Sequence, residues 1–186
     1  MREEIFDRCA CGVMRVLAWI LGSMPVDWAL RAGAWGGRLA YFLRSGKGVS
    51  YLNLKAAFEG SRSVGEMKRL ARKSMENLGR TAVEILRLPQ IDRRYLEEHC
   101  AVVDYPRISE ALRRGRGLIF LSAHFGNWEL LSAVSTTLKG HPLKFMVREQ
   151  KLARVNAYLN ALRKHHGAEP IRRGLSVKEM MRALKG

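Results

Sequence analysis

The 186-residue chain is predicted to be an α/β protein with a mainly parallel sheet flanked by helices. From residue 100 onward, short runs of β-forming residues alternate with amphipathic stretches of helical length. Parallel strands need a long crossover, usually a helix, so this alternation favours right-handed crossovers within one sheet. With 47% hydrophobic residues, the chain can bury a substantial core, and this excludes a disordered protein.

Residues 1–45 are predicted to form a separate N-terminal element, and residues 46–186 the α/β domain. The apolar run 16–26 is too short for a standard transmembrane helix, and a second run, 28–43, is interrupted by arginines and glycines. Tryptophans with interspersed arginines favour two helices at a membrane interface. These tryptophans are Trp19, Trp28 and Trp35. The same residues are also compatible with a role in covering the core.

A glycine-containing connector, residues 45–48, marks the predicted boundary. Ser63 and Glu66 form a capping box that predicts the start of a long amphipathic helix, which Pro89 follows just past its end near residue 86. A short polar helix is expected over 92–99. Beyond it, the predicted strands are 101–103, 117–123, 143–147 and 169–171, and the predicted helices are 106–114, 128–139, 152–165 and 176–184.

The formal net charge of +16 is unevenly distributed, because residues 111–186 carry 15 Lys and Arg against 4 Asp and Glu. An acidic partner is therefore expected: a phosphorylated glycolipid, an anionic membrane surface, an acidic acyl carrier protein or nucleic acid. Nucleic acid is not favoured, because no zinc-finger, helix-turn-helix or RNA-binding strand pattern accompanies the charge. Three cysteines without framework spacing, Cys9, Cys11 and Cys100, indicate reduced thiols.

The predicted strand 117–123 ends at His124, and Asn127 is expected to cap a helix that carries Glu129 in its first turn. A residue at this end of a strand, before a helix, lies where open α/β sheets bind ligands. The Glu129 carboxylate could orient the His124 imidazole, and the pair would suit deprotonation of a hydroxyl that attacks an acyl thioester. Alternatively, Glu129 only complements the helix dipole and His124 is an ordinary loop histidine.

The sequence His-Phe-Gly-Asn-Trp-Glu at 124–129 resembles the H-x4-D/E block of the lysophospholipid and glycerolipid acyltransferases, in the form typical of the lipid A biosynthesis acyltransferases. Further resemblance lies in residues 53–58, 77–80 and 115–117, in Arg148 and in Arg163. The family places a short helix at 49–58. Its members continue past residue 186 with a strand carrying an Asp-Gln pair and a further arginine, so the chain resembles a C-terminally shortened member.

This resemblance implies a glycerolipid acyltransferase-like fold and an O-acyltransferase in which His124 is the general base and Glu129 orients it. It implies substrate binding by Phe125, Gly126, Asn127, Trp128, Arg148 and Arg163. Backbone N–H groups at residues 127 and 128 would stabilise the oxyanion. No metal or cofactor is expected.

The implied acyl donor is an acyl carrier protein, with coenzyme A as an alternative, and the implied acceptor is a lipid A precursor or another phosphorylated glycolipid or lysolipid. The implied location is the cytoplasmic face of the inner membrane. Two other classes stay open at this point. One is a non-catalytic, membrane-peripheral module that binds lipid or acyl carrier, and the other is a basic nucleic-acid-binding protein.

Overall fold

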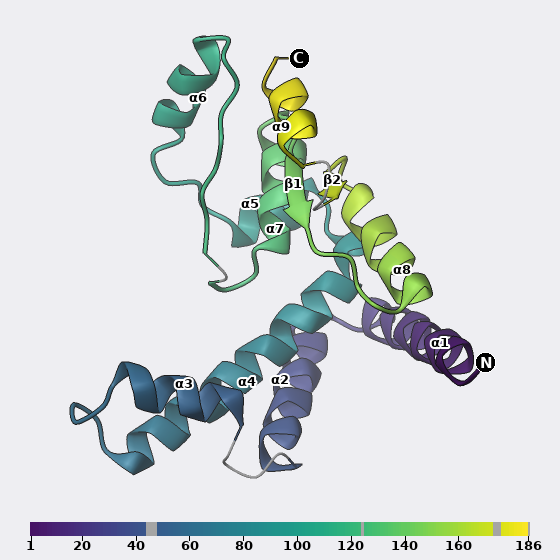
Figure 1. The fold of residues 1–186 in the computed structure, drawn as a ribbon, viewed down its shortest axis with the longest axis vertical. Coiled ribbons are helices and arrows are strands. Elements are labelled where there is room, and N and C mark those ends of the chain that lie inside the picture. The colour runs from purple at the N-terminus through teal and green to yellow at the C-terminus, as the bar shows by residue number, and fades with distance from the viewer. Residues whose placement is uncertain (44–47, 124, 173–175, 186) are drawn as a thin grey trace. The chain divides into compact units, whose positions relative to one another are not determined.

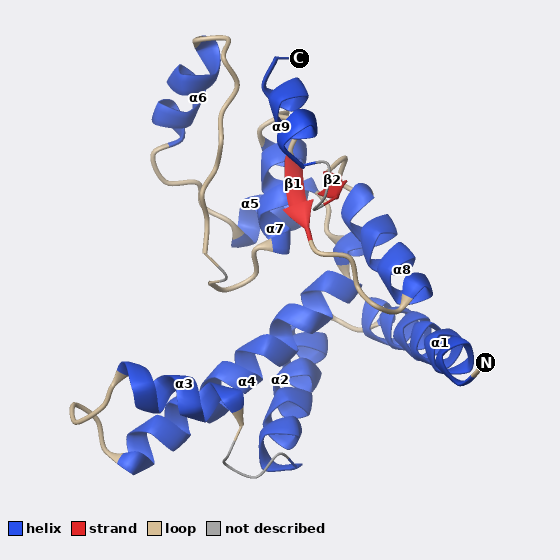
Figure 2. Cartoon of the chain, in the orientation of Figure 1, coloured by secondary structure: helices blue, strands red, loops and turns tan. Residues whose placement is uncertain are grey.

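The computed structural model describes residues 1–43, 48–123, 125–172 and 176–185. Within these residues the chain is mostly helical, with one sheet of two short strands (Figure 2). It divides into two compact units, one of residues 16–87 and one of Met1–Arg15 with Leu88–Gly186. The predicted boundary near residue 45 falls inside the first of these units and stays a prediction; most of the expected connector lies outside the described residues.

The unit of residues 16–87 is built on two packed helices, α2 (Val26–Leu43) and α4 (Val64–Leu86), with the short α3 (Val49–Ala57) beside α4 (Figure 1). The expected capping box is present, because Glu66 N–H donates to Ser63 Oγ (3.2 Å) and Ser63 N–H donates to Glu66 Oε2 (2.9 Å). The predicted long helix is therefore confirmed with its N-terminus at the expected residue.

Glycines allow α2 and α4 to approach at backbone distance. A Cβ added at Gly33 would lie 2.6 Å from the Gly79 carbonyl oxygen, and one at Gly79 would overlap the Gly33 carbonyl oxygen. A Cβ at Gly37 would likewise overlap the Met75 carbonyl oxygen. Since these neighbours are backbone atoms, neither helix can accept a side chain there without moving apart.

The other unit begins with the first part of α1 (Arg2–Ser23), whose residues up to Arg15 belong to it. The buried Asp7 carboxylate accepts from the backbone N–H groups of Arg154 (2.9 Å) and Val155 (3.2 Å) at the start of α8 (Ala153–Lys164). Asp7 therefore acts as an N-cap supplied by a different helix, which fixes α1 to the N-terminus of α8.

The sheet of this unit pairs β1 (Lys144–Val147) with β2 (Glu169–Arg172) in parallel, with Lys144 opposite Glu169. The connection between them runs through α8, as expected for a strand–helix–strand crossover. The other elements are η1 (Leu88–Gln90), α5 (Arg93–His99), α6 (Tyr105–Arg113), α7 (Glu129–Ala133), η2 (Val134–Leu138) and α9 (Ser176–Lys185). Leu88 and Leu96 are fully buried in its core.

Two predicted strands are wrong for the described residues. Residues 117–123 are not a strand, and their side chains are largely exposed: Ile119 is 72% and Leu121 99% accessible. Residues 101–103 are not a strand either. A strand exists only where a neighbour completes its hydrogen-bond ladder, and in the described part of the chain only β1 and β2 do so for each other. The predicted sheet is therefore reduced to two strands.

The helices predicted after residue 90 are confirmed within a residue or two, with one difference. The helix expected over 128–139 is α-helical only to Ala133 and continues as the π-helix η2. Hydroxyl groups bond back to the backbone in this segment: Thr136 Oγ1 donates to the Ser132 carbonyl (2.8 Å), and Ser135 Oγ donates to the His141 carbonyl (3.1 Å). Such bonds compete with regular helical geometry.

The N-terminal helices α1 and α2 occupy the two predicted apolar runs. Among the described residues, no helix combines the length and the apolar character needed to cross a membrane. Trp19, Trp28 and Trp35 are each more than 60% exposed, so they do not cover a core here.

Candidate active site

The candidate site begins where the chain enters α7. Gly126 has a φ of +61°, a left-handed conformation that glycine adopts without steric cost. Asn127 follows, and its Oδ1 accepts from the Glu129 N–H (3.0 Å). The N-cap position of α7 is Trp128, one residue after the predicted Asn127. The first helical residue, Glu129, follows this turn, and its side chain lies in the interior, where the residue is 5% exposed.

Glu129 forms a bidentate ion pair with Arg163 of α8. Arg163 Nε lies 3.1 Å from Oε1 and 3.0 Å from Oε2 of Glu129, and Arg163 Nη2 lies 2.6 Å from Oε1. The side chains are 5% and 15% exposed. Arg163 is therefore not a solvated surface arginine of α8, because its guanidinium holds a buried carboxylate.

Two further residues position the Arg163 guanidinium. Asn160, one turn earlier on α8, accepts from Arg163 Nη1 (3.1 Å). The Phe145 ring of β1 lies under the guanidinium, 5.7 Å from Cζ to the ring centroid, which is cation–π geometry. The guanidinium N–H groups donate to Glu129 and Asn160, and one guanidinium face stacks on Phe145, so the Arg163 side chain has little rotational freedom. The ion pair fixes the Glu129 carboxylate in the same way.

The remaining predicted residues are distributed as follows. His124 lies outside the described residues, so its relation to Glu129 stays a prediction. Phe125 is 91% exposed, Trp128 is half-buried, and Arg148 is exposed directly after β1. The structure thus brings together Asn127, Glu129 and Arg163. No cluster of three His, Cys, Asp or Glu side chains among the described residues has metal-binding geometry.

Sequence reasoning missed Asn160 and Phe145. Asn160 carried a usable signal, because an asparagine three residues before an arginine on one helix face can meet it, as Asn77 meets Arg80 on α4 (2.8 Å). Phe145 carried none, since its contact with Arg163 depends on how β1 packs against α8.

One histidine near this region has a perturbed pKa. His166, at the end of α8, donates from Nε2 to the Leu88 carbonyl oxygen (2.8 Å), and the Thr137 hydroxyl lies 3.3 Å from Nδ1. Burial lowers its pKa below the ordinary value of 6.5, because desolvation disfavours the charged ring. His166, which lies just past the last residue of α8, therefore connects to η1 through Leu88 and to η2 through Thr137.

The amino-acid sequence was compared with those of known protein families and known proteins. Residues 11–186 match the family model described as bacterial lipid A biosynthesis acyltransferase. Over 111 residues the chain is 29% identical to a phosphatidylinositol mannoside acyltransferase of Mycolicibacterium smegmatis, a match that covers 60% of this chain and 36% of that protein. The chain therefore aligns with about a third of the length of this curated relative. No solved structure matches it.

The family match includes the whole segment that carries Asn127, Glu129 and Arg163, so the paired glutamate and arginine lie in the shared region. On this match, the chain belongs to the bacterial lipid A biosynthesis acyltransferase family.

Proposed function

We propose that the protein transfers a fatty acyl chain from an acyl carrier protein thioester to a hydroxyl of a lipid A precursor or a related glycolipid or lysolipid. Membership of the family supports the reaction class. The observation that carries the assignment to this site is the buried Glu129 carboxylate, which a bidentate arginine holds five residues after His124.

In the proposed reaction, His124 removes the proton from the acceptor hydroxyl as the oxygen forms a bond to the thioester carbonyl carbon. The tetrahedral intermediate collapses by breaking the C–S bond. The proton passes from the imidazolium to the departing sulfur, so the products are the ester and the free thiol of the carrier. Glu129 orients His124 and stabilises its protonated form in this scheme.

The role proposed for Glu129 is compatible with its ion pair. A carboxylate offers about four lone-pair directions, and Arg163 engages only part of them. Arg163 acts here as a positioning residue that fixes the carboxylate. Arg148, exposed after β1, is the candidate for binding a phosphate of the acceptor.

The proposed location is the cytoplasmic face of the inner membrane. Along α1, the buried Asp7 and Cys11 face inward, and large apolar residues at helical spacing are exposed. These exposed residues are Ile5, Phe6, Val13, Val16, Leu17 and Ile20. An amphipathic helix that exposes its apolar side suits insertion into a bilayer interface. The basic residues of 111–186 suit an acidic carrier and anionic lipid.

The test incubates the protein with carrier loaded with labelled acyl chain and with a panel of acceptors: a lipid A precursor, a mannosylated phosphatidylinositol and a lysophospholipid. Label is expected in an ester product of one acceptor class, with stoichiometric release of carrier thiol. Thiol release with every acceptor and without ester would show thioester hydrolysis and contradict the proposal.

A second candidate is a non-catalytic module that binds lipid or acyl carrier. The ion pair of Glu129 favours this candidate, because Arg163 already donates hydrogen bonds to both carboxylate oxygens. This candidate predicts retention of the lipid or the loaded carrier with no ester formed. The same incubation separates the two, because bound and esterified label are resolved by extraction.

A further inference from the structure

The start of α8 has no side-chain N-cap of its own. Leu152 occupies the N-cap position, and its apolar side chain accepts no hydrogen bond. The Asp7 carboxylate of α1 takes this role, because Oδ2 accepts from the Arg154 N–H (2.9 Å) and Oδ1 from the Val155 N–H (3.2 Å). These are the second and third residues of the helix, whose N–H groups an N-cap side chain usually bonds. Asp7 is 7% exposed, so its carboxylate is buried with both oxygens bonded.

Two more residues of α1 contact α8 from the same face. Cys11, one turn after Asp7, is buried, and its thiol sulfur lies 3.8 Å from the Arg154 carbonyl oxygen. Arg15, a further turn along α1, lies over the Tyr158 ring, 5.6 Å from Cζ to the ring centroid. Because residues four apart stack along one side of a helix, one face of α1 holds the first turns of α8.

The opposite face of α1 is apolar and exposed. Ile5, Phe6 and Val13 are between 57% and 64% accessible. At about 100° of rotation per residue, they lie on the side of the helix away from Asp7. Arg2 is exposed on the same side. An exposed apolar face that carries a basic residue suits an anionic bilayer, with the apolar side chains inserted and the arginine at the headgroups.

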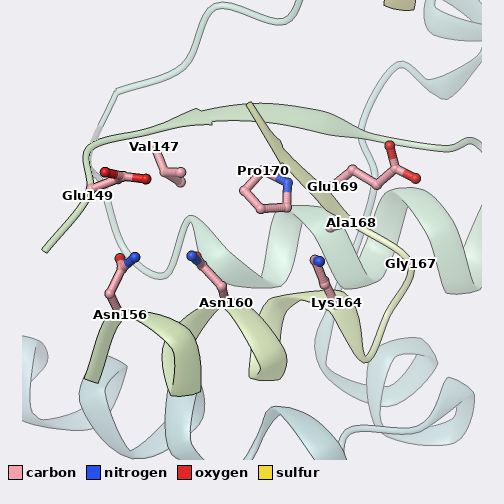
Figure 3. A pocket seen from close by; sticks show the side chains of 9 residues that line it. All are labelled: Val147, Glu149, Asn156, Asn160, Lys164, Gly167, Ala168, Glu169 and Pro170. Atoms are coloured by element: carbon pink, nitrogen blue, oxygen red, sulfur yellow. The ribbon is translucent and has the colours of Figure 1, made fainter. Parts of the chain in front are cut away.

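The α8 helix also positions the candidate active site. Further along it, Arg163 holds the buried Glu129 carboxylate, and Asn160 holds Arg163. Figure 3 shows that Asn156, Asn160 and Lys164 project from α8 toward the two strands, so this helix forms one wall of a cavity of about 510 Å³. Because a helix is hydrogen-bonded internally, a displacement of its first turn also displaces these side chains.

We propose that Asp7 is a positioning residue for the acyl-transfer site, and that it transmits the docking of α1 on an anionic lipid surface to α8. This inference rests on the proposed function, in which α1 lies at a bilayer. Lipid can bind one face of α1 while Asp7 holds α8 from the other face. A lipid surface that binds α1 as a helix stabilises that helix by mass action, and the bonds from Asp7 to α8 are then broken less often.

The kinetic test measures acyl transfer with and without vesicles of equal parts phosphatidylglycerol and phosphatidylethanolamine. The wild-type kcat should rise severalfold on vesicles. In Asp7→Ala this rise should be lost, with the KM for the loaded carrier unchanged, because Asp7 acts on the site and not on carrier binding. Asp7→Asn keeps one oxygen acceptor and should retain part of the rise. It provides a second reading should Asp7→Ala fail to fold.

The second readout needs no substrate. Hydrogen-exchange mass spectrometry of a peptide spanning 152–158 reports on the first turn of α8. Loss of a helix cap corresponds to about 2- to 30-fold in the local opening equilibrium, so exchange in Asp7→Ala should be faster by this factor. Vesicles should slow this exchange in the wild type and leave it unchanged in Asp7→Ala.

The matched control is Glu4→Gln. Glu4 is a carboxylate on the same helix, and it is exposed and paired with Arg8 of α1 (2.9 Å). This variant should match the wild type in both readouts. Sedimentation with vesicles should show equal lipid binding by the wild type, Glu4→Gln and Asp7→Ala, because Asp7 lies opposite the apolar face.

Equal stimulation by vesicles in the wild type and Asp7→Ala would overturn the proposal, and so would loss of vesicle binding in Asp7→Ala. Its outcome is separable from that of the proposed function. If vesicles slow exchange at 152–158 through Asp7 and no acyl transfer occurs, the acyltransferase activity is contradicted and the link from α1 to α8 stands. If acyl transfer occurs and vesicles change neither kcat nor exchange, the link is contradicted and the activity stands.

Discussion

The α2–α4 crossing and the described residues 117–123 and 125 both carry apolar side chains, yet the structure treats these side chains in opposite ways. At the crossing, Gly33 and Gly79 are in backbone contact. In the segment, Leu121 and Phe125 are 99% and 91% exposed. A helix forms its backbone hydrogen bonds internally and needs a neighbouring element only to bury its side chains. A strand needs a neighbouring strand for its backbone hydrogen bonds as well as a partner for its side chains. The comparison shows why apolar side chains are packed between two helices in one place and exposed in the other.

Substitution of the buried ion pair should have the largest effect on stability. Arg163→Met leaves the Glu129 carboxylate buried without its partner, which costs about 3–5 kcal/mol of unfolding free energy. Chemical denaturation followed by circular dichroism measures the loss. The double variant Glu129→Leu/Arg163→Met should recover most of it, because an apolar pair replaces the charges. Equal destabilisation in both variants would contradict the pairing.

The glycine contact should be the next most sensitive position. Gly79→Ala places a Cβ against the Gly33 carbonyl oxygen, and we expect a loss of about 1–3 kcal/mol from overpacking. Gly36→Ala on α2 is the matched control, because nothing lies within 4 Å of the added Cβ. It should stabilise the helix by up to about 1 kcal/mol. Similar thermal midpoints for both variants would show that the helices are not in backbone contact.

The exposed segment should be the least sensitive. Leu121→Ser should change the unfolding free energy by less than about 0.5 kcal/mol, because the side chain is almost fully accessible. Hydrogen exchange of the backbone amides of 118–122 should be fast. A loss above 2 kcal/mol with slow exchange would mean that this segment pairs with a strand in solution, as the sequence predicts, and the contrast with the α2–α4 crossing would disappear.

The pH dependence of the unfolding free energy tests the contribution of His166 to stability. Because burial lowers the pKa of His166, the unfolded state binds the proton more readily than the folded state. The contribution of His166 to stability is therefore present above about pH 6.5 and is lost as the pH falls below it through the folded pKa. His166→Gln should flatten the stability profile in this window, and an unchanged profile would place the pH dependence elsewhere.

The sequence predicted what depends on local pattern. The Ser63–Glu66 capping box follows from residues within one turn of each other, and the long α4 helix follows from the spacing of its apolar residues. The pair Glu129–Arg163 does not, because 34 residues separate its members and no local spacing relates them. Arg163 was identified as a site residue from the family resemblance, and its partner became visible only through the packing of α8.

The two strands that were wrongly predicted, 101–103 and 117–123, also depend on contacts that local sequence does not determine. Residues 117–123 carry strong β propensity, and propensity cannot supply the neighbouring strand that completes a ladder. The parallel pair β1–β2 could be predicted because both strands flank α8 in a strand–helix–strand unit.

The most direct measurement of the central claim is the single-turnover rate of acyl transfer from loaded carrier, compared between wild type and His124→Ala. A general base contributes about 10²–10⁴-fold, so the variant should transfer slower by that factor with the carrier still bound. A wild-type rate in His124→Ala, at matched stability, would contradict the account.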